Sequence, residues 1–310
     1  MEPLVSIVVP VYNQGQYLDE ALQSLLAQTY RNIEIIALDD GSTDATSEVL
    51  KKYTGRLYWE SQSNIGQSGT LNKGWQMAKG ELLSYLSGDD ALLPEAIATS
   101  VDYLTRNPGA VLSYCDFTLI DPHSRPIRQV TTPDFNFRRM ITDVICPPGP
   151  GPLFRRSAFE KAGLWDPQYR QMPDYDYWLR LGLQGEFVRI QQVLANFRVH
   201  VSSQTFSQAS EDRAEEPVRI IQGFFENPAV PVGLQSLRAQ ALSRAYLVSA
   251  QLHVRSGRLG RGLQNIRRAI GLSPGSIVRR GSARMLVNAF VNRIGHRLLW
   301  NLKRLGTRSY

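Results

Sequence analysis

The sequence predicts an α/β protein in which a mixed, mostly parallel sheet is flanked by helices and followed by a helical C-terminal extension. Apolar, β-branched runs of strand length alternate with amphipathic segments in the N-terminal part of the chain, as βαβ units require. From about residue 206 onward helical patterns continue without any strand pattern. With 310 residues, of which 43% are hydrophobic, the chain can form one large domain with an appendage or two domains.

Four strands are expected in the N-terminal part, and the first two are expected to be buried. The four strands cover residues 5–11, 33–38, 57–60 and 82–86. Helices are expected over residues 15–28 and 67–78. Between them, a helix that ends at residue 52 is expected to begin with Thr43 or Asp44 as its N-terminal cap. A further helix is expected to begin at Pro94.

The second half of the expected domain is less regular. A strand is expected over residues 110–118, and residues 121–152 are expected to be irregular because they are rich in Pro and Arg. Residues 174–183 are then expected to form a helix, and residues 187–190 and 193–199 two further strands. We therefore predict a domain over residues 1–205 and a helical extension over residues 206–310.

Polar residues follow three of the predicted strands. Tyr12 and Asn13, then Asp39 and Asp40, and finally Asp89 and Asp90 stand at these strand ends. Ligands of parallel α/β sheets bind beyond the carboxyl ends of the strands. The three ends are therefore expected to converge on one ligand-binding crevice.

Cysteine content and hydropathy bear on whether the protein contains disulfides, a zinc site or a membrane span. Cys115 and Cys146 are the only two cysteines, so neither a disulfide framework nor a zinc site is expected, and a reducing, cytoplasmic location is the default. Residues 1–10 do not resemble a signal peptide, and no window has the roughly 18 apolar residues of a membrane span. The protein is expected to be soluble or to sit on a membrane surface.

Six segments in order carry a family resemblance over roughly residues 4–205. They read VSIVVPVYNQGQYLDEALQSLLAQTY, IEIIALDDGSTDAT, NIGQSGTLNKGWQMAKGELLSYLSGDD, FRRSAFEKAGLWDP, DYDYWLRL and FRVHVSSQT. This part of the chain resembles the family 2 glycosyltransferases, which have the GT-A fold and invert the anomeric centre. The resemblance implies a nucleotide-sugar-binding half over residues 1–109 and an acceptor half over residues 110–205.

A metal site is expected at the end of the fourth strand. Carboxylates there can hold Mg²⁺ or Mn²⁺ against a leaving diphosphate, and Asp89 and Asp90 are the candidate ligands. The family motif resembles Asp-x-Asp, whereas this chain has Ser87-Gly88-Asp89, so it has one carboxylate fewer. His200, in a segment similar to the family's Arg-x-His, is a further candidate ligand. The alternatives are that the two aspartates only form a turn and cap a helix, and that His200 is structural.

Donor-binding residues follow from the same resemblance. It implies that Asp39 and Asp40 contact the base and ribose of a UDP- or dTDP-type sugar nucleotide. A carboxylate can accept a hydrogen bond from a uracil N–H. An Asx turn is the alternative for this pair. The other implied donor-binding residues are Pro10 and Tyr12, which form the wall for the base, Lys73, Ser87 and Gly88. A solvent-facing Lys73 is equally compatible with the sequence, and Arg198 is implied to lie near the phosphates.

An inverting transfer needs a general base within reach of the acceptor hydroxyl. In the family an Asp at the start of a helix has this role, usually after a Glu, and here the matching segment begins Pro173-Asp174-Tyr175-Asp176. Asp174 is the first candidate and Asp176 the second, with helix capping as the alternative for Asp174. The implied activity is transfer of a sugar to a saccharide or lipid-linked acceptor, in surface polysaccharide or glycolipid assembly.

Two rival functions stay open. A sugar nucleotidyltransferase would need a glycine-rich, basic phosphate loop after the first strand, and the segment Tyr12-Asn13-Gln14-Gly15 does not supply one. A catalytically inactive nucleotide-sugar-binding module is compatible with the departures at Ser87 and Pro173.

The C-terminal extension is strongly basic. Residues 227–310 contain 15 Lys and Arg and no acidic residue, although the whole chain has a net charge of only +7. Residues 243–274 resemble one tetratricopeptide-like helical hairpin, and residues 284–304 form an amphipathic pattern with basic flanks. This segment can bind an anionic membrane surface on the inner face of the membrane or pack on the core. Nucleic acid is not expected because aromatic residues for base stacking are scarce.

Overall fold

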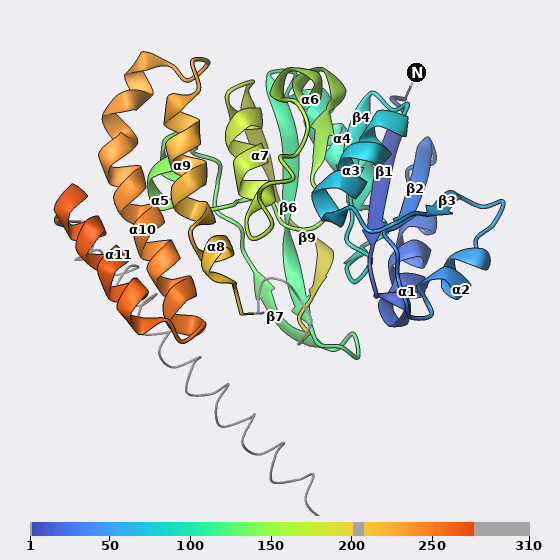
Figure 1. The fold of residues 1–310 in the computed structure, drawn as a ribbon. Coiled ribbons are helices and arrows are strands. Elements are labelled where there is room, and N and C mark those ends of the chain that lie inside the picture. Colours follow the sequence, from blue (N-terminus) through green and yellow to red (C-terminus); the bar gives the residue numbers. More distant parts are fainter. Residues whose placement is uncertain (1, 201–207, 276–310) are drawn as a thin grey trace, which may run out of the picture. The chain divides into compact units, whose positions relative to one another are not determined.

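The computed structural model describes residues 2–200 and 208–275, and the amphipathic segment expected over residues 284–304 lies outside the described residues. The chain divides into two compact units, of which the first comprises residues 1–137 and 146–203 and the second residues 138–145 and 204–310 (Figure 1). No helix within the described residues is long and apolar enough to cross a membrane.

The first unit is built on one mixed sheet. Its order is β3-β2-β1-β4-β8-β6-β9-β5, and β7 pairs with β6 beside this path. The strands are β1 (Val5–Val11), β2 (Ile33–Asp39), β3 (Tyr58–Ser61), β4 (Leu82–Tyr85), β5 (Ala91–Leu92), β6 (Ala110–Ile120), β7 (Pro126–Val130), β8 (Leu153–Arg155) and β9 (Glu186–Arg198). Parallel pairing joins β3, β2, β1 and β4, and also β6 and β9, whereas β8 is antiparallel to both β4 and β6.

Helices cover this sheet because each presents an apolar stripe to it. They are α1 (Gly15–Leu26), α2 (Thr46–Lys51), α3 (Gly66–Met77), α4 (Ala96–Arg106), α6 (Arg156–Ala162) and α7 (Pro173–Gly182). Every residue of β1 is buried, as expected for a central parallel strand. On α1, Leu18 and Leu22 are fully buried and belong to the same core as Val9 of β1.

The start of α1 and the start of α2 are joined at close range. A Cβ on Gly15 would lie 2.7 Å from the backbone nitrogen of Thr46, so this approach requires glycine. The Asp44 carboxylate accepts hydrogen bonds from the backbone N–H groups of Gly15 and Thr46, both at 3.0 Å. Of the two capping residues proposed for α2, Asp44 therefore bonds to the helix start.

Two expectations about the second half of the sheet differ from the structure. Residues 121–152 contain β7 and the helix α5 (Phe137–Asp143), which the Pro and Arg content had argued against. Pro126 is tolerated because it is the first residue of a strand that pairs only with β6. The two expected strands at 187–190 and 193–199 form the single strand β9, whose pairing with β6 is irregular around Asp116.

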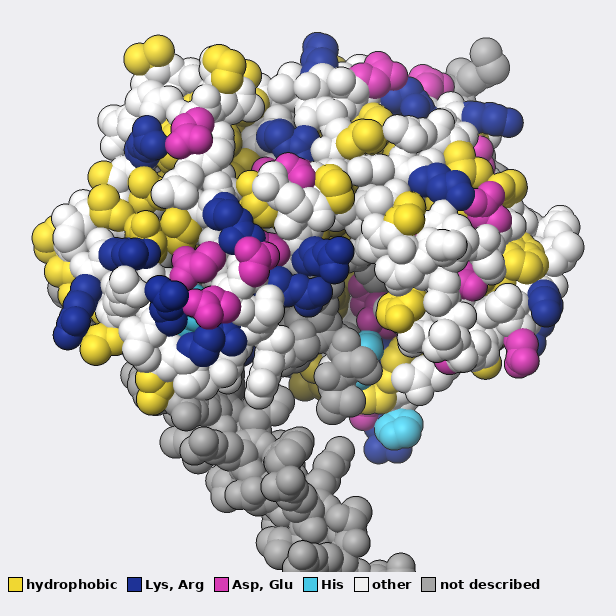
Figure 2. All heavy atoms as spheres, viewed as in Figure 1, with side chains coloured by type: hydrophobic (Ala, Val, Ile, Leu, Met, Phe, Trp, Pro, Cys, Tyr) yellow, Lys and Arg dark blue, Asp and Glu magenta, His cyan; other side chains and the backbone are white. Residues whose placement is uncertain are grey.

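The second unit is helical, as the sequence predicts. Its described helices are α5, α8 (Glu211–Ala214), α9 (Glu216–Glu226), the 3₁₀ helix η2 (Val232–Leu237), α10 (Arg238–Arg255) and α11 (Leu259–Leu272). The hairpin of α10 and α11 turns at Gly257, whose φ of 86° is left-handed. Figure 2 shows acidic, basic and hydrophobic side chains mixed over this unit.

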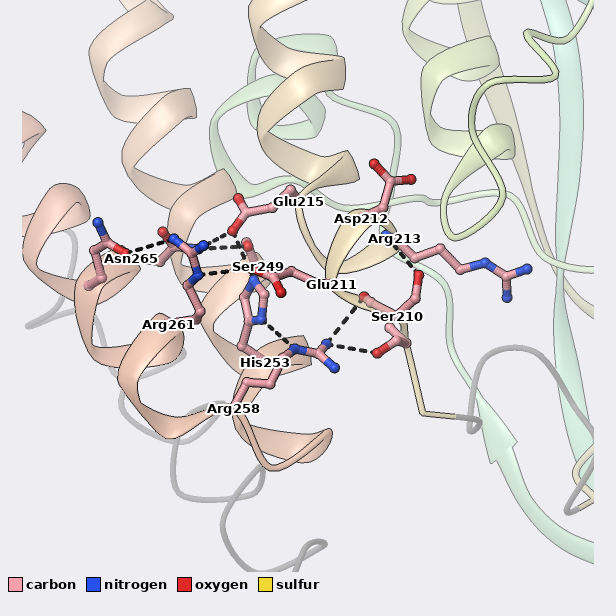
Figure 3. Close-up of polar contacts among 12 residues, drawn as sticks. Ser210, Glu211, Asp212, Arg213, Glu215, Ser249, His253, Arg258, Arg261 and Asn265 are labelled. Carbon is pink, nitrogen blue, oxygen red and sulfur yellow. Dashed lines mark hydrogen bonds and ion pairs between the residues drawn. The ribbon is translucent and has the colours of Figure 1, made fainter.

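A buried histidine organises the polar contacts between α8, α10 and α11 (Figure 3). The Arg258 Nε–H group donates to His253 Nδ1 at 2.8 Å, so the ring proton resides on Nε2. His253 Nε2 lies 2.8 Å from a Glu215 carboxylate oxygen, and Asn265 donates to the same oxygen at 3.0 Å. The His253 side chain is fully buried, whereas Glu215 is 28% exposed. Glu215 is thus the acceptor that satisfies two donors of the unit's interior.

We predict that Glu215→Ala lowers the free energy of unfolding by about 1–3 kcal/mol, because His253 and Asn265 lose their shared acceptor. Urea unfolding measures this, with Glu226→Ala as the control because Glu226 is 69% exposed and should matter little. Hydrogen bonds to Asn265 and His253, acting against burial, lower the pKa of Glu215. The stabilisation by Glu215 should therefore be present above the unfolded-state pKa of Glu and be lost on acidification below it. Equal unfolding curves for both variants would contradict this role.

Candidate active site

The polar residues predicted to converge lie at one edge of the sheet. In the parallel register Val11 of β1 is opposite Asp39 of β2, and β4 runs in the same direction beside β1. Since β8 is antiparallel to both β4 and β6, and β9 is parallel to β6, the end of β9 points to the same edge as the end of β4. His200, two residues beyond β9, is thereby brought to the turn that follows β4.

Asp89 and His200 form the central pair of this site. His200 Nε2 lies 2.8 Å from Asp89 Oδ2, and the two side chains are 7% and 13% exposed, respectively. The ring of Tyr17 on α1 lies 5.0 Å from the imidazole, measured between ring centroids. A carboxylate and an imidazole are both ligands for divalent transition-metal ions, so the pair fits two positions in such a site.

Asp90 has a different environment from Asp89. One oxygen of its carboxyl group accepts the backbone N–H of Arg198 at 2.9 Å, and the residue is 5% exposed. Burial and the neighbouring charge of Asp89 raise the pKa of Asp90 well above its usual value. Within residues 2–200 and 208–275 no group of three or more His, Cys, Asp or Glu is placed to hold a metal ion. The structure thus pairs Asp89 with His200 but does not assemble them with Asp90 into a three-residue metal site.

The buried guanidinium of Arg198 holds the turn that carries Asp89. Its Nε donates to the backbone carbonyl of Asp89 at 2.8 Å, and another nitrogen contacts the Glu20 carboxylate at 2.6 Å. The remaining nitrogen donates to Ser124 Oγ at 2.9 Å. The guanidinium carbon lies 4.7 Å from the centre of the Tyr17 ring. Arg198 is 1% exposed, so its side chain lies inside the fold and holds the Asp89 turn by hydrogen bonds. The family resemblance had instead implied a position near the phosphates.

The two aspartates after β2 are buried and bonded to neighbouring loops. Asp39 accepts the Ser42 N–H at 2.9 Å and the Ser61 hydroxyl at 2.8 Å. Asp40 accepts the N–H groups of Ile65 and Gly66 at 2.8 and 2.9 Å, at the start of α3. These bonds hold the edge beyond β2 in place. Asp39 and Asp40 are only 2% and 3% exposed, respectively.

The other expected donor-site residues lie around the same strand ends. Pro10 is buried in β1, and Tyr12 is 52% exposed directly beyond it. A Cβ on Gly88 would lie 2.9 Å from Gln14 Oε1, so the turn after β4 packs against the residues that follow β1.

Lys73 and Ser87 complete this set. Lys73 on α3 forms an ion pair with Glu60 and donates to Gln62 Oε1 at 2.9 Å. Gln62 in turn donates to Asp40 Oδ1 at 3.1 Å, so Lys73 is connected to the rigid edge beyond β2. The backbone carbonyl of Ser87 accepts the Asp90 N–H at 3.0 Å, which closes the turn that presents Asp89.

Asp174 lies in the first turn of α7, and Pro173 begins this helix. The Asp174 carboxylate accepts the Tyr175 N–H at 2.9 Å on Oδ1 and lies 3.4 Å from Cys146 Sγ on Oδ2. Burial raises the pKa of Asp174. Asp176, by contrast, forms an ion pair with Arg180 at 2.7 Å one turn later in the helix. Asp174 is therefore the less neutralised of the two candidate bases.

Tyr85 lies close enough to both Asp174 and Asp90 for the two groups to influence its ionisation. Burial raises the pKa of this tyrosine, and the neighbouring acidic groups of Asp174, Cys146 and Asp90 raise it further. Tyr85 is the last residue of β4, so the candidate base lies near the start of the turn that carries Asp89.

Sequence reasoning missed three residues of this neighbourhood: Glu20, Tyr85 and Cys146. Glu20 and Cys146 have no local pattern that marks them, since their partners are Arg198 and Asp174 in distant parts of the chain. Tyr85 had a detectable signal, because it lies near the end of the strand predicted over residues 82–86, which precedes the metal motif.

Comparison with known sequences identifies related proteins. A family model described as glycosyl transferase family 2 matches residues 6–163. Relatives from Rickettsia prowazekii and Rickettsia typhi, both described as uncharacterized glycosyltransferases, are 34% and 35% identical over 211 residues, which is 66% of this chain and 66% of each relative. The match thus spans slightly less than two thirds of these two proteins. A Nostoc relative with the same description is 30% identical over 226 residues, covering 68% of this chain and 70% of the relative.

Solved structures with the same fold include two complexes with nucleotide sugars. Staphylococcus aureus TarS 1–349 in complex with UDP-GlcNAc has a TM-score of 0.67 and 17% identity, covering 95% of this chain and 92% of that chain. The mannosyltransferase PcManGT of Pyrobaculum calidifontis, in complex with GDP-Man and Mn²⁺, has a TM-score of 0.61 and 15% identity, covering 96% and 88%. At these identities the likeness concerns the fold, and it confirms the GT-A fold that the sequence motifs implied.

We predict that Arg198→Met lowers the free energy of unfolding by about 3 kcal/mol or more, because buried charge-assisted hydrogen bonds to Glu20 and to carbonyl oxygens are lost. Chemical denaturation measures the change. Arg106→Met is the matched control, since the ion pair of Arg106 with Asp102 is exposed and should contribute little. A denaturation midpoint for Arg198→Met equal to that of the control would show that the hydrogen bonds of Arg198 do not stabilise the fold.

Proposed function

Because the chain belongs to glycosyl transferase family 2, we propose that it transfers a sugar from a nucleoside-diphosphate sugar to an acceptor hydroxyl, with inversion at the anomeric carbon. The observation that carries the proposal is the pairing of Asp89 with His200 at the strand ends, with the half-buried carboxylate of Asp174 near Tyr85 at the end of β4. This arrangement would supply a place for a leaving diphosphate and a separate proton acceptor.

The donor is proposed to be a UDP- or dTDP-type sugar. The exposed ring of Tyr12 offers a surface on which the base can lie, with Pro10 and the rigid Asp39–Asp40 edge beside it. Lys73, Ser87 and Gly88 are proposed to line the phosphate side of this donor site. The complex of TarS with UDP-GlcNAc supports the uridine assignment by analogy of fold.

A divalent cation, Mg²⁺ or Mn²⁺, is the proposed cofactor. Asp89 and His200 would hold it together with oxygens of the diphosphate, and its charge would stabilise the leaving group. The Mn²⁺ in the PcManGT complex supports this choice. Asp90 would act through its bond to the Arg198 backbone, which keeps the Asp89 turn in place.

Asp174 is proposed to be the general base. It would accept the proton of the acceptor hydroxyl as that oxygen bonds to the anomeric carbon and the bond from this carbon to the diphosphate oxygen breaks. Attack from the side opposite the diphosphate gives inversion. A carboxylate with a raised pKa is a stronger base than an ordinary aspartate, so burial of Asp174 suits this step. Asp176 is disfavoured because Arg180 already neutralises it.

We predict that release of nucleoside diphosphate from UDP- or dTDP-sugars, measured with Mg²⁺ or Mn²⁺ and a mixture of saccharide and lipid-linked acceptors, falls by about 10²–10⁴-fold in Asp174→Asn. Asp89→Ala and His200→Ala should lose cation-dependent turnover as well. Asp102→Ala, an exposed aspartate on α4, is the control and should keep full activity.

The same assay separates the rival functions. Donor binding without turnover in the wild-type protein would indicate a catalytically inactive nucleotide-sugar-binding module. Release of pyrophosphate from a nucleoside triphosphate and a sugar phosphate would indicate a nucleotidyltransferase. Full activity of Asp174→Asn would contradict the assignment of the base.

The acceptor is proposed to be membrane-bound, as in surface polysaccharide or glycolipid assembly, so that the protein works on the cytoplasmic face of a membrane. Leu259, Leu263 and Ile270 are 43%, 49% and 43% exposed and share one face of α11. Arg267 and Arg268 belong to the same helix, and residues 227–310 contain no acidic residue. An apolar stripe with basic flanks fits the surface of an anionic bilayer.

We predict that the protein co-sediments with vesicles of phosphatidylglycerol and phosphatidylcholine and not with vesicles of phosphatidylcholine alone, and that salt weakens the binding. The double variant Leu259→Gln/Leu263→Gln should bind about tenfold more weakly, because two apolar side chains no longer enter the interface. Val232→Gln is the control, since Val232 is 88% exposed but lies on η2. Equal sedimentation with both vesicle types would argue against the anionic surface.

A further inference from the structure

Cys146 lies between α5 and β8 and faces the proposed base. Its Sγ is 3.4 Å from Asp174 Oδ2 and 3.9 Å from the carbonyl oxygen of Pro148. Burial, followed by the charge of Asp174, raises the pKa of the Cys146 thiol well above its usual value. Cys146 is therefore a neutral thiol at physiological pH, and it is the hydrogen-bond donor in this contact.

The two oxygens of the Asp174 carboxylate have different donors. Oδ1 accepts the backbone N–H of Tyr175, which belongs to the same helix, and Oδ2 accepts from the thiol of Cys146. The thiol of Cys146 thus provides a hydrogen bond to the Asp174 carboxylate from a residue outside α7. Both bonds favour the ionised carboxylate and oppose the effect of burial on the pKa of Asp174.

We propose that Cys146 is a positioning residue for the general base, whose thiol keeps the Asp174 carboxylate ionised and directs Oδ2 while leaving a lone pair on that oxygen for the acceptor proton. This inference rests on the proposed role of Asp174. A thiol suits the task because it is a weak donor. A strong donor at the same place would hold the carboxylate more firmly but make it a weaker base.

The other ionisable groups around Asp174 do not replace this contact. Tyr85 faces Asp174 from β4, and its raised pKa keeps it neutral. Asp90 is another neighbour of Tyr85, and its carboxyl group accepts the backbone N–H of Arg198. Asp176 on α7 is paired with Arg180. Among these described neighbours, Cys146 is the side chain that donates a hydrogen bond to the Asp174 carboxylate.

The test is the pH profile of kcat/KM for sugar transfer, measured for the wild-type protein and for Cys146→Ala and Cys146→Ser. Activity should fall on acidification as Asp174 becomes protonated. In Cys146→Ala the midpoint of this acidic limb should move to higher pH by about half a unit or more, because the ionised carboxylate loses a donor. In Cys146→Ser the midpoint should stay or move lower, because a hydroxyl is the stronger donor, and the KM for the donor sugar should be unchanged in both.

Cys115→Ala is the matched control, since Cys115 is a buried cysteine of β6 whose pKa burial raises to about 12. It should lower the melting temperature without moving the acidic limb. An acidic limb in Cys146→Ala at the wild-type midpoint would overturn the proposal, whatever the change in stability. If Cys146→Ala does not fold, an acidic limb in Cys146→Ser above the wild-type midpoint would overturn it. Asp174→Asn in the same series distinguishes a wrong base, since it would then retain turnover at all pH values.

Discussion

The buried guanidinium of Arg198 is the constraint on which the site depends. A cation removed from water is tolerated only if its donors are bonded, and Arg198 bonds to Glu20, Ser124 and the carbonyl of Asp89. Its backbone N–H bonds to Asp90 at the same time. One residue thus attaches the end of β9 to the turn after β4. His200 can meet Asp89 because these two segments are held together.

The acidic residues of the first unit have two distinct environments. Some are bonded to backbone N–H groups or to arginine and serve to hold loops in place, such as Asp40 at the start of α3 and Asp176 beside Arg180. Asp89 and Asp174 instead contact an imidazole and a thiol, respectively. A carboxylate whose charge is not neutralised by a fixed cation can bind a metal ion or take up a proton, so the proposed chemistry falls to these two.

The second unit is held together by a different kind of interaction. Its buried polar network centres on His253, whose two ring nitrogens contact Arg258 and Glu215. The network connects α8, α10 and α11, while the outer face of α11 remains apolar and exposed. The unit therefore combines a buried hydrogen-bond network around His253 with an exposed apolar stripe on α11 that is suited to a partner surface.

The sequence alone determined the alternation of strands and helices, because hydrophobic period and turn residues are local properties. It also determined that Tyr12, Asp40 and Asp89 follow strand ends on one edge of the sheet, because parallel strands point the same way. The tertiary structure decided what each polar side chain bonds to. The contacts of Asp90 with Arg198, of Asp89 with His200 and of Asp174 with Cys146 join residues that are 108, 111 and 28 positions apart. No local pattern encodes such contacts, because they arise only when the folded sheet brings distant segments together.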